Sequence, residues 1–222
     1  MEKRMQTILD LCQKLPVTAD VGCDHGYISL ELLKQNKTDY VIATDISKPS
    51  LQKAIDLLNQ KGFKDKFCAR VGDGLSVIKS DESIDQVVIA GMGGQEIIHI
   101  LQEFKGKNML KNIVLQPMNQ IKQLREYLTN NGFKINRDII VKEGEKFYHI
   151  LGVNLGKQKL NMLKLGFGAN IEDCKTEDFK LWLKQKQFKI KRILKGMPKD
   201  NPKAEMFEKW LENMEQIKQI IN

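Results

Sequence analysis

The sequence predicts an α/β fold in which a mainly parallel β-sheet is followed by a helical hairpin. Short apolar runs alternate with helical patterns through the first 130 residues, which is typical of βαβ units. After residue 156, apolar residues recur only at helical spacing. A chain of 222 residues can bury one such domain and a small appendage. We therefore expect two domains, at residues 1–156 and 157–222.

The predicted elements of the first domain follow a regular order. Parallel strands are expected at 18–22, 40–45, 67–71, 86–90 and 112–116, with helices at 28–35, 47–61, 95–104 and 121–131. Ser47 is expected to cap its helix, since Pro49 lies in the first turn. Segments 134–142 and 146–155 are rich in β-forming residues and flank a short glycine-containing loop. They predict an antiparallel hairpin at the end of the sheet.

The C-terminal region predicts two amphipathic helices that pack along a coiled-coil-like seam. Thr176 is a candidate N-cap for the first helix, and Gly196 and Pro198 interrupt the helical pattern. Asn201 and Pro202 then open the second helix. The two helices would form an antiparallel hairpin.

The segment ADVGCDHGY at residues 19–27 is the most informative stretch of the chain. A predicted strand ends there in a glycine turn, and the next strand ends on Asp45, which is the layout of a nucleotide-binding βαβ unit whose acid holds a ribose. The dinucleotide fingerprint needs a glycine where this chain has Asp24, because a side chain would crowd a pyrophosphate. S-adenosyl-L-methionine (SAM) has no phosphate and carries a sulfonium cation, so the acidic turn favours SAM. With five parallel strands and an antiparallel ending, the chain predicts a seven-stranded, Rossmann-like class I SAM-dependent methyltransferase.

Composition excludes several other classes of protein. No run of about 18 apolar residues exists, so no membrane span is expected. The N-terminal pattern predicts a helix and not a signal peptide. The four cysteines lack metal-ligand spacing and the three histidines are scattered, so no metal site is expected. A cytoplasmic, reducing location is the expectation, and we expect a monomer.

Positive charge is concentrated near the C-terminus. The net charge is +8, and residues 157–222 hold 15 basic and 9 acidic side chains. Nine of the basic side chains lie within residues 180–203. A cluster of this density suits a polyanion, although a solvated helix face would give the same pattern.

Six blocks in order carry a family resemblance: ADVGCDHGY, ATDIS at 43–47, VGDGL at 71–75, IAGMGG at 89–94, LQPMNQ at 115–120 and GEKFYHIL at 144–151. With the helical C-terminal region, the chain resembles the TrmK family of bacterial tRNA (adenine-N1)-methyltransferases over nearly its whole length. The resemblance implies methyl transfer from SAM to N1 of the adenosine at position 22 of tRNA. It also implies that the C-terminal helices help to hold the tRNA.

Expected cofactor contacts follow from these blocks. Asp45 would accept hydrogen bonds from the ribose hydroxyls, Asp73 would accept from the adenine amine, and Asp20 would orient the turn or the methionine part of SAM. The full set of expected cofactor residues is Asp20, Gly22, Gly26, Asp45, Ile46, Asp73, Gly74, Ala90 and Gly91.

Asp24 is the candidate catalytic residue, because a carboxylate near the adenine amine would stabilise the cation that N1 methylation creates. It could also only brace the turn. The candidate substrate contacts are His25, Tyr27, Met92, Gly93, Gly94, Gln116, Pro117 and Asn119 around the base, and Lys186, Lys189 and Arg192 along the tRNA backbone. His25, Tyr27 and Met92 could instead be packing residues.

Two other functions remain open from the residues alone. A methyltransferase acting on another RNA nucleotide, a small molecule or a protein would explain the first 156 residues but not the basic helices. A non-catalytic RNA-binding protein would explain the helices, but the acids at positions 20, 45 and 73 argue against loss of the cofactor.

Overall fold

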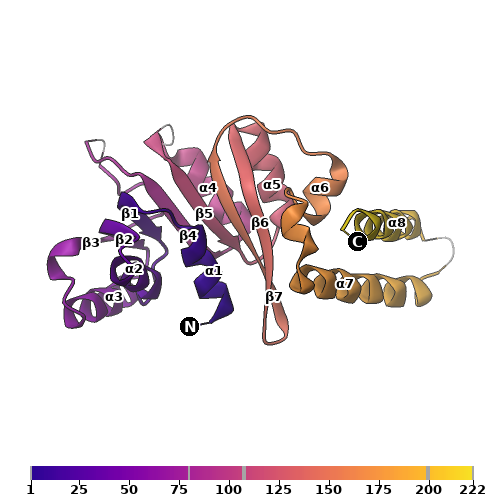
Figure 1. Cartoon of the computed structure of the whole chain (residues 1–222), viewed down its shortest axis with the longest axis horizontal. Helices are drawn as coiled ribbons and strands as arrows, with labels where there is room; N and C mark the ends of the chain where they lie inside the picture. The colour runs from indigo at the N-terminus through magenta and orange to yellow at the C-terminus, as the bar shows by residue number, and fades with distance from the viewer. Residues whose placement is uncertain (1, 80, 107–108, 199–200, 222) are drawn as a thin grey trace.

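A seven-stranded mixed sheet forms the centre of the computed structural model, which describes residues 2–79, 81–106, 109–198 and 201–221. The strand order is β3-β2-β1-β4-β5-β7-β6 (Figure 1). The strands are β1 (Leu15–Val21), β2 (Thr38–Asp45), β3 (Phe67–Val71), β4 (Gln86–Met92), β5 (Asn112–Pro117), β6 (Phe133–Glu143) and β7 (Lys146–Leu155). The helices are α1 (Lys3–Leu11), α2 (Tyr27–Lys34), α3 (Lys48–Gln60), α4 (Gly94–Glu103), α5 (Ile121–Asn130), α6 (Met162–Phe167), α7 (Glu177–Lys195) and α8 (Ala204–Ile221).

Strand direction confirms the predicted class I methyltransferase layout. Strands β1 to β5 pair in parallel, whereas β7 pairs antiparallel with both β5 and β6. The carboxyl ends of the five parallel strands therefore meet at one edge of the sheet. In open α/β sheets, ligands bind at this edge, where the strand order reverses.

Alternate side chains of each central strand enter two different apolar layers. Val87 and Ile89 of β4 pack with α4 and α5, while Val88 packs with α1 and α2. Helices α2 and α3 cover the far end of that second face, against Val41 and Ala43 of β2. Both faces of the sheet are thus covered, as the continuous apolar runs of the strands require.

Two predicted helix caps are confirmed. The Ser47 hydroxyl accepts a hydrogen bond from the backbone N–H of Ser50, and the Thr176 hydroxyl accepts one from the N–H of Phe179. Each satisfies a donor that the first turn of a helix leaves free. None of the described helices is both long and apolar enough to cross a membrane.

The C-terminal helices have an apolar core of their own at the β6 edge of the sheet (Figure 1). Phe179, Trp182 and Leu183 of α7 pack with Met214 and Ile217 of α8, and the cluster also takes in Ile140 of β6. The predicted boundary after residue 156 falls between β7 and α6. Helix α6 was not predicted, because its six residues are too few to show a helical period.

A buried ion pair joins this core to the sheet. The Arg125 guanidinium donates two hydrogen bonds to the Asp138 carboxylate, and both side chains are 0% exposed. Arg125 also donates to the carbonyl of Leu165, and Asp138 accepts from the N–H of Ala169. One ion pair thereby fixes α5, β6 and the segment around α6. Burial and the neighbouring Arg125 cation also lower the pKa of His149 to about 3, so this side chain is neutral.

Replacement of Arg125 by Met should destabilise the fold strongly, because Asp138 would remain buried without its partner. We expect the free energy of unfolding to fall by about 3–5 kcal/mol in urea titrations. The matched control is Lys180→Met, which breaks an exposed pair with Glu177 and should cost about 0–1 kcal/mol. Equal unfolding midpoints for the two variants would contradict the structural role of the pair.

Candidate active site

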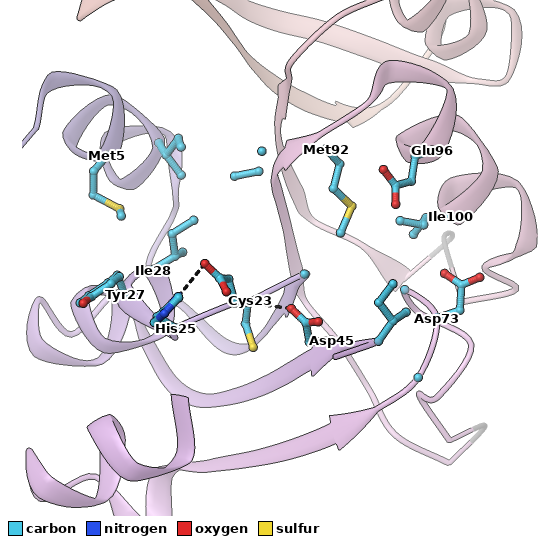
Figure 2. Close-up of a pocket in the computed structure, with 18 of the residues that line it drawn as sticks. Met5, Cys23, His25, Tyr27, Ile28, Asp45, Asp73, Met92, Glu96 and Ile100 are labelled. Atoms are coloured by element: carbon cyan, nitrogen blue, oxygen red, sulfur yellow. Dashed lines mark hydrogen bonds and ion pairs between the residues drawn. The ribbon is translucent and has the colours of Figure 1, made fainter. Parts of the chain in front are cut away.

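A pocket of about 600 Å³ opens at the carboxyl ends of β1, β2 and β4 (Figure 2). This volume lies within the range of about 300–1,000 Å³ that is usual for small-molecule sites. Its lining is contributed by α1, α2 and α4, by the ends of β2 and β4, and by the turns after β1, β2 and β3. The lining residues are Arg4, Met5, Ile8, Gly22, Cys23, Asp24, His25, Tyr27, Ile28, Asp45, Ile46, Gly72, Asp73, Gly74, Ala90, Gly91, Met92, Glu96, His99 and Ile100.

The turn after β1 depends on glycine at two positions. Gly22 has φ +69°, and a Cβ there would lie 2.1 Å from Cε of Met92, whose side chain lines the pocket. Gly26 has φ +74° and precedes α2, and a Cβ there would lie 2.7 Å from Cβ of Ala54 in α3. Gly22 therefore lets Met92 lie over the turn, whereas Gly26 lets α2 approach α3 and does not line the pocket.

Asp45 is held in place by two backbone donors. Its Oδ1 accepts from the N–H of Ser47 at 2.7 Å, and its Oδ2 accepts from the N–H of Asp24 at 3.0 Å. The carboxylate thus joins the turn after β2 to the turn after β1 and lines the pocket between them (Figure 2). Each carboxylate oxygen has more than one acceptor position, so a ligand can still donate to both.

The end of the pocket beyond Asp45 combines acidic and apolar side chains. Asp73 and Gly74 follow β3, and Ile46, 72% exposed, follows β2. A Cβ on Gly74 would lie 2.7 Å from Ile100 of α4, so this glycine keeps α4 close to the pocket. Figure 2 shows Asp73, Glu96 and Ile100 on the same side of the cavity.

Asp24, His25 and Tyr27 form the opposite side of the pocket. The Asp24 carboxylate lies 2.7 Å from Nδ1 of His25, and Nε2 of His25 lies 3.2 Å from the Lys53 ammonium. An ammonium can only donate, so Nε2 accepts and Nδ1 carries the hydrogen that Asp24 receives. The hydrogen bond from His25 lowers the pKa of Asp24, which is therefore a carboxylate. The His25 and Tyr27 rings stack at 6.1 Å with an angle of 13°.

Several predicted contacts lie outside the pocket lining. Asp20 is 1% exposed, and its carboxylate accepts from both the N–H and the hydroxyl of Ser29. Asp20 thus orients the turn and the start of α2, one of the two roles expected of it. Burial raises its pKa to about 6.

The residues near the ends of β4 and β5 that were expected to surround the target base mainly contact one another. Gly94 donates its N–H to the side chain of Asn119, and a Cβ on Gly94 would lie 2.7 Å from the Asn119 carbonyl oxygen. Gly93 precedes α4, where its N–H donates to Glu96. Gln116 and Pro117 are buried, and Gln116 accepts from Arg4. Of the residues predicted to contact the base from these two loops, only Met92 lines the pocket.

Nine lining residues were not predicted: Arg4, Met5 and Ile8 of α1, Glu96, His99 and Ile100 of α4, and Cys23, Ile28 and Gly72. Helical spacing identified both helices but not which of their residues face the sheet edge.

The three basic residues expected to bind tRNA also differ from one another. Lys189 and Arg192 are exposed on α7, whereas the Lys186 ammonium lies over the rings of Trp182 and Trp210. Burial lowers the pKa of Lys186.

Metal and thiol chemistry find no support in the described part of the chain. No group of three or more His, Cys, Asp and Glu side chains is arranged there to hold a metal ion. Cys23 lines the pocket, but burial and the nearby Asp20 and Asp45 raise the pKa of its thiol, so it is not a thiolate nucleophile.

The size of the pocket and the acceptors in its lining fit SAM. SAM needs an acceptor for its ribose diol, an acceptor for its adenine amine and an anionic setting for its two cationic groups. Asp45, Asp73 and Asp24 lie along one cavity and meet these needs.

Comparisons with known proteins agree on one family. The family model TrmK, tRNA (adenine(22)-N(1))-methyltransferase, matches residues 18–220. The tRNA (adenine(22)-N(1))-methyltransferase of Bacillus subtilis (strain 168) is 33% identical over 157 residues, which span 70% of this chain and 66% of that enzyme.

Solved structures extend the likeness over the full length. The crystal structure of the B. subtilis m1A22 tRNA methyltransferase TrmK has a TM-score of 0.82 at 27% identity and covers 100% of this chain and 99% of its own. A Streptococcus pneumoniae protein solved in complex with SAM has a TM-score of 0.87 at 26% identity and covers 100% of both chains. This chain therefore belongs to the TrmK family and is a SAM-dependent tRNA (adenine-N1)-methyltransferase.

Proposed function

We propose that the pocket between Asp45 and Asp24 is the site in which this enzyme methylates N1 of the adenosine at position 22 of tRNA. The observation that carries this proposal is the Asp45 carboxylate, which two backbone amides fix at the edge of a pocket of about 600 Å³. The adenosyl part of SAM is assigned to the Asp45 and Asp73 end, and the target base to the side of His25 and Tyr27.

Residues on the adenosyl side supply acceptors and open backbone. Asp45 accepts hydrogen bonds from the ribose hydroxyls, Asp73 accepts one from the adenine amine, and Ile46 packs on the adenine ring. Gly91 has positive φ and lines the pocket, and no atom lies within 4 Å of where its Cβ would be, so a ligand can approach its backbone closely. At Gly22 the corresponding space is taken by Cε of Met92. SAM, when bound, supplies a sulfonium methyl group that a nitrogen lone pair can attack.

Methylation of adenine N1 requires positioning of the nitrogen and does not require a proton acceptor. Adenine N1 has a free lone pair at neutral pH, so no proton has to leave before methyl transfer. The product is a cationic base, and a nearby carboxylate stabilises the charge as it develops. Asp24 is assigned this role through the adenine amine, because it is ionised, exposed and in the pocket lining.

The segment that ends β4 and begins α4 also fits attack by a ring nitrogen. Enzymes that methylate exocyclic amines commonly carry an Asp/Asn-Pro-Pro-aromatic sequence there, and this chain has Ala90-Gly91-Met92-Gly93-Gly94. His25 and Tyr27, stacked on each other, offer an aromatic surface for a base drawn out of the tRNA. Asp24 and Lys53 hold the two nitrogens of His25, which fixes the orientation of its ring.

The exposed face of α7 is proposed to hold the tRNA backbone. Lys184, Lys189 and Arg192 surround Phe188, which is 64% exposed, in one shallow depression. The cations can pair with phosphates, and an exposed aromatic ring can stack on an unpaired base. Lys186 is assigned a supporting role under this face, since Trp182 and Trp210 already bind its ammonium.

We propose that the enzyme acts as a monomer. All four cysteines are free, as expected for a reducing compartment, and the substrate is tRNA. We therefore propose a cytoplasmic location.

Asp45→Asn should weaken SAM binding, both because the charge is lost and because the amide can accept from only one of the two backbone N–H groups that Asp45 holds. The amide keeps the size of the side chain but loses the charge, and a hydrogen bond to a charged group is worth about 1.5–3 kcal/mol, or roughly ten- to hundredfold in affinity. Calorimetric titration with S-adenosylhomocysteine measures this loss. The control is Asp39→Asn, which removes an exposed carboxylate near the opposite end of β2. Equal affinities for both variants would show that Asp45 does not bind the ligand.

Asp24→Asn should slow methyl transfer by about 10²–10³-fold, as loss of a charge-stabilising group typically does. The rate is measured with labelled SAM and a tRNA transcript, followed by nucleoside analysis for N1-methyladenosine. Asn tolerates the positive φ of +46° at this position, so the turn should persist.

Two measurements separate the chemical role of Asp24 from a structural one. S-adenosylhomocysteine affinity should stay at the wild-type value, whereas a residue that only braces the turn would lower it together with the rate. A transcript with guanosine at position 22 should receive no methyl group from the wild-type enzyme. Methylation of that transcript at another nucleotide would refute the proposed target.

Charge reversal of Lys184, Lys189 and Arg192 to Glu should weaken tRNA binding and leave S-adenosylhomocysteine binding unchanged. The slope of log affinity against log salt should fall by about 1 for each phosphate that the variant no longer binds, measured by filter binding at several salt concentrations. The control reverses three exposed lysines, Lys61, Lys64 and Lys66, which precede the edge strand β3 at the opposite end of the sheet from α7. Unchanged tRNA affinity in the α7 variant would show that this helix has a purely structural role.

A further inference from the structure

A groove of about 300 Å³ lies between α7 and α8, the two long helices of the C-terminal hairpin (Figure 1). Its walls are apolar apart from two lysines of α7. The residues that line it include Lys186, Lys189 and Ile193 of α7 and Met206, Phe207 and Trp210 of α8. We propose that this groove holds the base of one unpaired nucleotide of the tRNA, an inference that rests on the proposed docking of tRNA on α7.

The hairpin is closely packed along most of α8 and open where α8 begins. Met214 and Ile217 are 0% and 1% exposed, whereas Met206 is 48% exposed. Phe207 and Trp210 are only half-buried. Water therefore reaches apolar side chains that face each other across the groove, and a flat apolar group would remove that surface from water.

Lys186 gives the groove a cation that no acid neutralises. Its ammonium lies 4.6 Å from the centre of the Trp182 ring and 5.7 Å from that of Trp210. Lys180 and Lys218, in the same two helices, each pair with a glutamate three residues away. Lys186 pairs with no carboxylate among the residues that the structure describes. A purely apolar occupant would bury this charge further without a partner, so the groove favours an occupant that carries an anion.

The charged neighbours of Lys186 are also positive. Burial lowers the pKa of Lys186, and the cations of Arg125 and Lys189 lower it further. Lys189 is exposed, and it lines both the groove and the depression on the outer face of α7. An anion bound at Lys189 would therefore reduce the repulsion around Lys186 as well.

A nucleotide combines the two features that the groove requires. The face of a base can stack on the aromatic wall formed by Phe207 and Trp210, and the attached phosphate can pair with Lys189. A base within a double helix is already stacked on both faces, so the nucleotide has to be unpaired. Lys189 and Ile193 line both surfaces of α7, so one RNA strand can reach the groove from the outer face.

The groove lies at a defined distance from the active-site edge of the sheet. Helix α7 begins at that edge, where the Asp178 carboxylate accepts from the N–H of Lys142 near the end of β6. Lys189 follows Asp178 by about three helical turns, or roughly 16 Å. A nucleotide in the groove would therefore fix one point of the tRNA at this distance along α7.

Tryptophan fluorescence tests the proposal directly. A short single-stranded RNA should quench the emission of the wild-type protein, because a base would lie against Trp210, whereas Trp182 is only 5% exposed. An RNA duplex of the same length should quench much less. Trp210→Phe keeps an aromatic wall, so it should lose most of the quenching and retain affinity for a labelled single strand.

A matched pair of variants tests the groove with tRNA itself. Met206→Glu places a carboxylate at the mouth of the groove and should weaken tRNA binding roughly five- to hundredfold, the effect of losing one stacked base. The control is Ile220→Glu, which changes a side chain of similar exposure, 51%, at the other end of α8 and outside the groove. Both variants should keep the unfolding midpoint and the S-adenosylhomocysteine affinity of the wild type.

The remaining outcomes overturn the proposal in distinguishable ways. Equal tRNA affinities for Met206→Glu and Ile220→Glu would refute the groove site. The docking of tRNA on α7 would still stand if charge reversal of Lys184, Lys189 and Arg192 weakened binding, and it would fail if that variant also bound normally. Quenching by phosphatidylglycerol vesicles or by a polyglutamate peptide, with none by RNA, would assign the groove to a different anion and refute the nucleotide.

Discussion

The active site depends on one carboxylate that bridges two turns. Asp45 accepts backbone hydrogen bonds from Asp24 in the turn after β1 and from Ser47 at the start of α3. These bonds require the carboxyl ends of β1 and β2 to lie side by side, as their parallel register provides. The same contact places the side chains of Asp24 and His25 at the pocket. The ribose contact and the target-base contact that we propose therefore share one structural support.

The fold was largely predictable from the sequence, because its signals are local. Gly22, Asp45 and the alternation of strands and helices predicted the nucleotide-binding unit, and the segments around Gly144 predicted the antiparallel ending that the structure confirms. Ser47 and Thr176 predicted two helix starts from capping chemistry alone. Each of these features is decided by residues close together in the chain.

The site was only partly predictable, because its walls come from segments far apart in the chain. Arg4 lines the pocket since α1 packs against the last strands of the sheet, a contact that no local pattern encodes. Asp20 and Asn119 differ from Arg4, because they were expected at the site and lie outside the pocket lining. Their place in the sequence predicted ligand contacts, but their side chains satisfy the backbone or side chains of neighbouring turns. Lys186 is part of a basic cluster in the sequence, but in the structure its ammonium lies over the ring of Trp182.

The arrangement of charge in this molecule matches the ligand that we propose for each surface. The pocket concentrates carboxylates, which suit the cationic groups of SAM and a base that becomes cationic. The outer face of α7 concentrates Lys184, Lys189 and Arg192, which suit a polyanion. The buried pair of Arg125 and Asp138 and the bond from the Asp138 N–H to Asp173 fix the helical region against the sheet. A tRNA held by phosphates on α7 would therefore meet the pocket at a constant distance, and that distance, more than contacts to bases, would select the nucleotide that enters.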